Sequence, residues 1–82
     1  MQYKEFMDLI ASKAPIFLSG IGGVSMRALA GLLIDMGAVV GGSDRDESKA
    51  IESLRKQGAK IQVPQNGQGI DGAALLIRTA AV

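Results

Sequence analysis

Three glycines and one aspartate are the residues of this chain whose spacing points to chemistry. Gly20, Gly22 and Gly23 follow a short apolar run and precede a segment rich in Ala and Leu, so they lie where a strand gives way to a helix. Backbone N–H groups at a helix N-terminus lack intrahelical partners, and the helix dipole favours negative charge there. Because glycine has no Cβ, a phosphate can approach the backbone closely at positions 22 and 23. The loop therefore predicts a phosphate site.

Asp44 stands 24 residues after Gly20 at the end of a second apolar run. This is near the spacing of about 20 residues at which an acidic residue binds a ribose in dinucleotide folds. The fingerprint is partial, because Ser25 stands where the pattern G-x-G-x-x-G has its third glycine. The alternative is that Asp44 is a turn or capping residue before the next helix, a role for which Asp46 competes. The acidic residues Asp44, Asp46 and Glu47 could suggest a metal site. The start of a helix attracts acidic residues as well, so no metal site is expected.

The composition excludes several function classes. The 82 residues include no Cys and no His, which removes thiolate nucleophiles, imidazole bases and the usual zinc ligands. Nine basic and eight acidic residues give a net charge of +1, so nothing favours nucleic acid or an acidic membrane surface. No apolar stretch approaches the roughly 20 residues that span a bilayer. We expect a cytoplasmic protein.

The apolar periodicity predicts helices and strands in alternation. Gly37 and Gly58 follow the second and third expected helices, residues 24–36 and 48–57, and glycine can take the positive φ that often ends a helix. Met26 and Met36 fall on the apolar stripe of the second helix and are expected in the core. The expected helices are residues 2–13, 24–36 and 48–57, and the expected strands are 15–19, 38–42, 59–63 and 73–78.

This order of elements is typical of an α/β domain with right-handed parallel crossovers. We expect residues 1–82 to form a single Rossmann-like, three-layer domain with a four-stranded parallel sheet of order 3-2-1-4. Ligands bind such sheets beyond the carboxyl ends of the strands. That edge is made by residues 20–26, 43–46, 64–66 and 79–82.

Six short motifs together resemble the N-terminal domain of the Mur ligases. The resemblance runs from about Pro15 to the last residue and is more specific than a dinucleotide fingerprint. Within the family it is strongest to members that join L-alanine to UDP-N-acetylmuramate, with members that recycle cell-wall tripeptide as near neighbours. The motifs are Phe17-Leu-Ser-Gly-Ile-Gly-Gly-Val-Ser-Met26, Leu29-Ala30, Gly42-Ser-Asp44, Leu54, Gly58-Ala-Lys-Ile61 and Thr79-Ala-Ala-Val82.

The resemblance implies that this domain holds the UDP part of a sugar nucleotide. One departure is Gln65, since the family often has histidine in that loop; a glutamine amide can still donate or accept one hydrogen bond there. By matching motif, Gly20, Ile21, Gly22, Gly23, Ser25 and Met26 would line the diphosphate, Asp44 would face the uridine, and Thr79 and Ala80 would lie at the nucleotide edge.

The resemblance also implies ATP and magnesium for the full-length enzyme, which forms an acyl phosphate that the amino group of L-alanine attacks. No Gly-Lys-Ser or Gly-Lys-Thr occurs in the chain, so it lacks a P-loop. We therefore expect a truncated N-terminal piece that binds UDP-N-acetylmuramate but is inactive without the central and C-terminal ligase domains. Two other interpretations stay open, namely an NAD-sensing Rossmann regulatory module and a Rossmann-like scaffold without a ligand.

Overall fold

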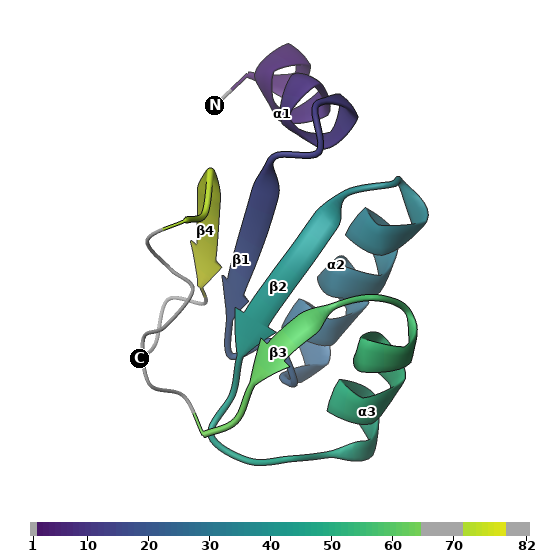
Figure 1. Cartoon of the computed structure of the whole chain (residues 1–82), viewed down its shortest axis with the longest axis vertical. Coiled ribbons are helices and arrows are strands. Elements are labelled where there is room, and N and C mark those ends of the chain that lie inside the picture. The colour runs from purple at the N-terminus through teal and green to yellow at the C-terminus, as the bar shows by residue number, and fades with distance from the viewer. Residues whose placement is uncertain (1, 65–71, 79–82) are drawn as a thin grey trace.

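Three helices and four strands make up the part of the chain that the computed structural model describes, residues 2–64 and 72–78 (Figure 1). None of the described helices is long and apolar enough to cross a membrane. In chain order the elements are α1 (Tyr3–Ala11), β1 (Pro15–Ser19), α2 (Val24–Asp35), β2 (Val39–Ser43), α3 (Lys49–Lys56), β3 (Lys60–Gln62) and β4 (Leu75–Arg78).

The four strands form one parallel sheet of order β3-β2-β1-β4, which confirms the predicted fold class and strand order. The strand β1 is central and has the predicted bounds. It pairs with β2 from Pro15 opposite Val39 to Ser19 opposite Ser43. The strand β3 is two residues shorter than expected, and β4 begins two residues later. The carboxyl ends of β1 and β2 therefore lie side by side, which brings the glycine loop next to Asp44.

The ends of the helices follow local chemistry. Gly37 and Gly58 take φ values of +91° and +111°, as predicted for glycines that end helices. The N-cap of α3 is Ser48, whose hydroxyl oxygen accepts a hydrogen bond from the Ile51 N–H at 3.2 Å. Met36 was expected in the core, and this is wrong, because it follows the last turn of α2 and is 39% exposed.

The core lies between the sheet and the helices α2 and α3. Ile16 and Leu18 of β1 are completely buried, and Val40 of β2 is nearly so. Their side chains alternate with those facing the other side of the sheet, as the two-residue period of a strand requires. From the helices, the core receives the side chains of Met26, Ala30, Leu33, Ile51 and Leu54.

The helix α1 lies beyond the start of β1 rather than over the sheet (Figure 1). Its end is fixed by Lys13, which has a φ of +61° and whose Nζ donates a hydrogen bond to the Gly37 carbonyl oxygen at 2.7 Å. Ile10 is buried against the core cluster. The two helices that cover the sheet, α2 and α3, share one of its faces, and no other described helix covers the opposite face. Three layers were expected, and the described residues form two.

Gly42 marks the closest approach between β2 and the start of the glycine loop. A Cβ built at this position would lie 2.5 Å from the Leu18 carbonyl oxygen and 2.8 Å from Cδ1 of Ile21. Both neighbours are completely buried and cannot move away easily. Glycine is therefore required here by packing.

We expect Gly42→Ala to lower the free energy of unfolding by about 1–3 kcal/mol or more, because it overpacks a closed site. The matched control is Gly31→Ala within α2, where a Cβ would meet nothing within 4 Å. That substitution should raise stability by about 0.5–1 kcal/mol through helix propensity. Urea unfolding measures both, and equal effects would contradict the packing argument.

Candidate functional site

The glycine loop, residues 20–23, is fixed to the end of β2 by its own backbone. Gly20 has a φ of +73°, which lets the chain turn sharply after β1. The N–H groups of Gly20 and Ile21 both donate to the Ser43 carbonyl oxygen, at 2.8 and 3.0 Å. The Ile21 side chain is completely buried beneath the loop. The loop is therefore part of the rigid core at this edge of the sheet.

Asp44 continues this attachment with its side chain. Its Oδ2 accepts a hydrogen bond from the Gly22 N–H at 2.8 Å, and its Oδ1 accepts one from the N–H of Arg45 at 2.7 Å. Its own N–H donates to the Gln62 carbonyl oxygen of β3 at 3.1 Å. Asp44 is thus a positioning residue that ties the loop to two strands. It does not cap α3, because Ser48 does.

Gly22 has an internal reason to be glycine. A Cβ there would lie 2.8 Å from Asp44 Oδ2 and 3.2 Å from Cδ1 of Ile51, so a larger residue would push the carboxylate away. Gly23 differs, because its Cβ would meet only the Gly20 carbonyl oxygen at 3.3 Å and the residue is exposed. Of the two glycines expected to face a diphosphate, Gly23 is therefore the one on the open surface.

Among the described residues, the unpaired N–H donors at this edge belong to the three residues that follow Gly23. The N–H groups of residues 20–23 are all engaged, since that of Gly23 donates to the Gly20 carbonyl oxygen at 3.0 Å. Within the described residues, the N–H groups of Val24, Ser25 and Met26 have no acceptor. The first turn of α2 carries no acidic residue, and its N-cap, Gly23, has no side chain to occupy these donors. This first turn can accept an anion.

Besides Gly20, Ile21 and Gly22, whose N–H groups are engaged within the protein, the predicted site residues lie in four settings. Ser25 and Gly23 are exposed at the free end of α2, whereas Met26 points into the core with 5% of its surface exposed, so only its backbone can serve a ligand. Asp44 is half-buried beside them. Gln65, Thr79 and Ala80 lie outside the described residues.

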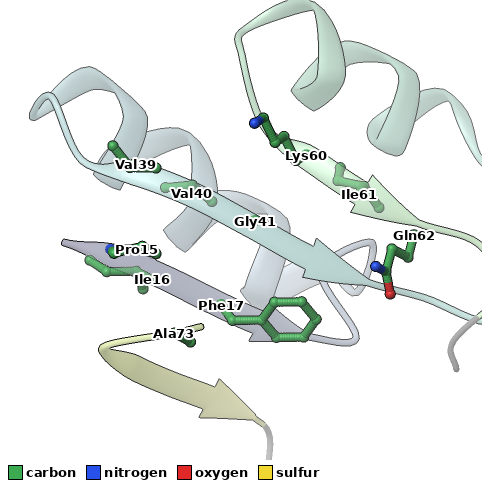
Figure 2. Close-up of a pocket in the computed structure, with 10 residues that line it drawn as sticks. All are labelled: Pro15, Ile16, Phe17, Val39, Val40, Gly41, Lys60, Ile61, Gln62 and Ala73. Atoms are coloured by element: carbon green, nitrogen blue, oxygen red, sulfur yellow. The ribbon is translucent and has the colours of Figure 1, made fainter. Parts of the chain in front are cut away.

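Gln62 is a polar residue that the sequence analysis missed. It is the last residue of β3, and its side-chain Oε1 is buried without a hydrogen-bond partner among the described residues. It also lines a groove of about 370 Å³ that lies on the sheet face away from α2 and α3 (Figure 2). The groove is thus separate from the free end of α2. The position of Gln62 follows from the strand register, which puts it opposite Ser43 of β2. The sequence alone carries no signal for this pairing.

We expect Asp44→Ala to destabilise the chain by about 1–3 kcal/mol, because the Gly22 N–H loses its acceptor in a half-buried position. Asp44→Asn keeps one acceptor oxygen and should recover part of the loss. The exposed Asp46→Ala is the control, with an expected change within about 0.5 kcal/mol. The measurements are urea unfolding and the exchange rate of the Gly22 amide proton. Unchanged Gly22 exchange in the alanine variant would contradict the role of Asp44.

Comparison with known proteins identifies the family of the chain. Residues 8–82 match the family model described as Mur ligase family, catalytic domain. The chain is 45% identical over 67 residues, 82% of its length, to the UDP-N-acetylmuramate--L-alanine ligase of Caldanaerobacter subterraneus. It is 37% identical over 76 residues, 93% of its length, to the ligase of the same name from Bradyrhizobium diazoefficiens.

The same name belongs to a Clostridium novyi relative that is 43% identical over 63 residues, 77% of this chain. The chain spans only 15%, 16% and 14% of the length of these three relatives, respectively. The residues that match the family model include both the glycine loop and Asp44. The chain belongs to the Mur ligase family.

Proposed function

We propose that this chain is the substrate-binding domain of an ATP-dependent ligase that joins L-alanine to UDP-N-acetylmuramate in cytoplasmic peptidoglycan precursor synthesis. The observation that carries the proposal is a row of three N–H groups, those of Val24, Ser25 and Met26, that have no acceptor among residues 2–64 and 72–78. They lie next to a loop that Asp44 holds in place. The names of the relatives supply the substrate. The proposed role of this domain is to bind and orient the UDP part.

The first turn of α2 suits a diphosphate for electrostatic reasons. Its N–H groups and the helix dipole together favour negative charge. With 12 residues, α2 has about three turns whose peptide dipoles add along the axis. The exposed Gly23 lets a phosphate oxygen approach the turn without meeting a Cβ. Because these donors are held rigidly before the ligand arrives, binding costs little ordering of the protein.

Asp44 can take part in binding while it holds the loop. An ionised carboxylate offers about four lone-pair positions, of which the N–H groups of Gly22 and Arg45 occupy two. A ribose hydroxyl can donate to one of the remaining positions. In this proposal the carboxylate fixes the distance between the diphosphate donors and the uridine, so it acts on both halves of the ligand.

The ATP and magnesium of the proposed reaction do not fit this domain. No three Asp, Glu, His or Cys side chains come together in residues 2–64 and 72–78, and the sequence has no P-loop lysine. ATP would activate the substrate carboxylate as an acyl phosphate. We assign its binding to other domains of the full-length ligase, and we expect the 82-residue chain alone to have no ligase activity.

NMR titration of the 82-residue chain with UDP-N-acetylmuramate, UDP and NADH in parallel tests the proposed ligand. We expect saturable amide shifts at Val24, Ser25, Met26 and Asp44 with both uridine nucleotides. Stronger, saturable shifts with NADH would overturn the proposal in favour of an NAD-sensing module. Absence of shifts with all three ligands would leave the scaffold interpretation.

Gly23→Ala tests whether the ligand approaches the turn closely. Gly23 has a φ of −65°, which alanine also adopts, although the added Cβ would lie 3.3 Å from the Gly20 carbonyl oxygen, which must move slightly to admit it. Because Gly23 is exposed and is the N-cap of α2, the methyl group would stand next to the first turn of the helix. We expect UDP affinity to fall about tenfold, equivalent to about 1.4 kcal/mol. Gly31→Ala, remote from this edge, is the matched control and should bind normally. Equal UDP affinity in both variants would remove the diphosphate from this turn.

A further inference from the structure

One arginine joins three parts of the fold next to Asp44. Arg55 lies in the last turn of α3, and its guanidinium makes two contacts. Its Nη1 donates a hydrogen bond to Glu47 Oε1 at 2.7 Å, and its Nη2 donates one to the Ile61 carbonyl oxygen at 3.0 Å. Glu47 belongs to the connection between β2 and α3, residues 44–48, and Ile61 is the middle residue of β3. Arg55 therefore connects a helix, a strand and the segment that begins with Asp44.

The contact with Ile61 holds the edge of the sheet. The strand β3 has three residues and stands first in the order β3-β2-β1-β4. The Gln62 carbonyl points toward β2, because it accepts a hydrogen bond from the Asp44 N–H at 3.1 Å. Carbonyl directions alternate along a strand, so the preceding Ile61 carbonyl points to the side where no described strand pairs with β3. Arg55 binds this carbonyl oxygen, and the end of β3 is thus held from both sides.

The contact with Glu47 closes a ring of interactions around the 44–48 connection. Asp44 is bound to Gln62, and Arg55 is bound to the neighbouring residue of the same strand. Arg55 also binds Glu47, from which the chain leads back to Asp44 over three peptide bonds. The connection has no helix or strand of its own, so such contacts decide its path. The ring therefore fixes Asp44 from the side opposite to the glycine loop.

The exposure of the ion pair indicates positioning rather than stabilisation. The side chains of Arg55 and Glu47 are 36% and 54% exposed, and an ion pair in contact with water adds little to the free energy of unfolding. A guanidinium is planar and its N–H groups point in fixed directions, so one arginine can fix two acceptors relative to each other. Here the two acceptors are the Glu47 carboxylate and the Ile61 carbonyl oxygen. Arg55 thus sets the distance between the 44–48 connection and β3.

We propose that Arg55 is a positioning residue for the nucleoside half of the ligand, acting on the Asp44 carboxylate through the path of the 44–48 connection. This inference rests on the proposed function, in which the first turn of α2 binds the diphosphate and Asp44 binds the ribose. The glycine loop has a separate anchor in the Ser43 carbonyl oxygen, which accepts two of its N–H groups. Loss of Arg55 therefore weakens the ribose contact more than the diphosphate contacts.

NMR titrations of the 82-residue chain with UDP and with inorganic pyrophosphate separate the two halves of the ligand. Arg55→Met removes both contacts and keeps a long side chain. Lys56→Met is the matched control, because Lys56 is exposed in the same turn and its loss changes the net charge equally. We expect the Kd of UDP to rise about fivefold in Arg55→Met and to stay within about twofold of the unchanged chain in Lys56→Met. The Kd of pyrophosphate should stay within about twofold in both variants.

Two further variants test whether Arg55 acts through its contacts. Arg55→Lys keeps the charge without the two fixed donor directions, so it should recover only part of the UDP affinity. Glu47→Ala combined with Arg55→Met should bind UDP no more weakly than Arg55→Met alone, because the ion pair is already lost. Additive losses in the double variant would overturn the inference.

Other outcomes separate this inference from the proposed function. Equal losses of UDP and pyrophosphate affinity in Arg55→Met, or equal UDP losses in Arg55→Met and Lys56→Met, would overturn the role of Arg55 and leave the proposed function standing. So would unchanged UDP affinity in Arg55→Met. If UDP does not bind the unchanged chain, the proposed function fails and this inference fails with it.

Discussion

The attachment of the glycine loop to the end of β2 is the constraint on which the rest of this structure depends. Four short contacts make it: two N–H groups of the loop on the Ser43 carbonyl oxygen, one on the Asp44 carboxylate, and the Asp44 N–H on β3. They connect three neighbouring strands at one edge. Because the N–H groups of the loop are already hydrogen-bonded within the protein, the loop needs no ligand to hold its shape. The start of α2 is thereby fixed in place and direction.

This arrangement separates two tasks that a glycine-rich loop is often assumed to share. The glycines build the turn, since Gly20 supplies positive φ and Gly22 leaves room for the carboxylate. The residues after them, from Val24 to Met26, hold the N–H groups that have no acceptor in the part of the chain that the structure describes. The buried side chain of Met26 then serves the fold, whereas its backbone N–H belongs to the proposed anion site. Site and scaffold use the same residues through different atoms.

The two faces of the sheet are unequal for a related reason. Both crossovers between β1 and β3 progress in the same direction, so right-handedness places α2 and α3 together. One apolar face is closed by aliphatic side chains, and the other keeps Val39 and Leu76 in contact with solvent.

By itself, the sequence determined the order of elements and the two helix-ending glycines, because hydrophobic period and positive φ are local properties. The strand order was predicted by analogy with doubly wound α/β sheets, and the structure confirms it. It also located the glycine loop and Asp44 as a pair. Only the tertiary structure decided that Asp44 points at Gly22, that Gly42 is glycine because of Ile21, and that Met36 is outside the core. The first two features depend on contacts between residues that are more than 20 positions apart in the chain, and the third depends on where a helix ends against its neighbours. The spacing of residue types along the sequence carries neither kind of information.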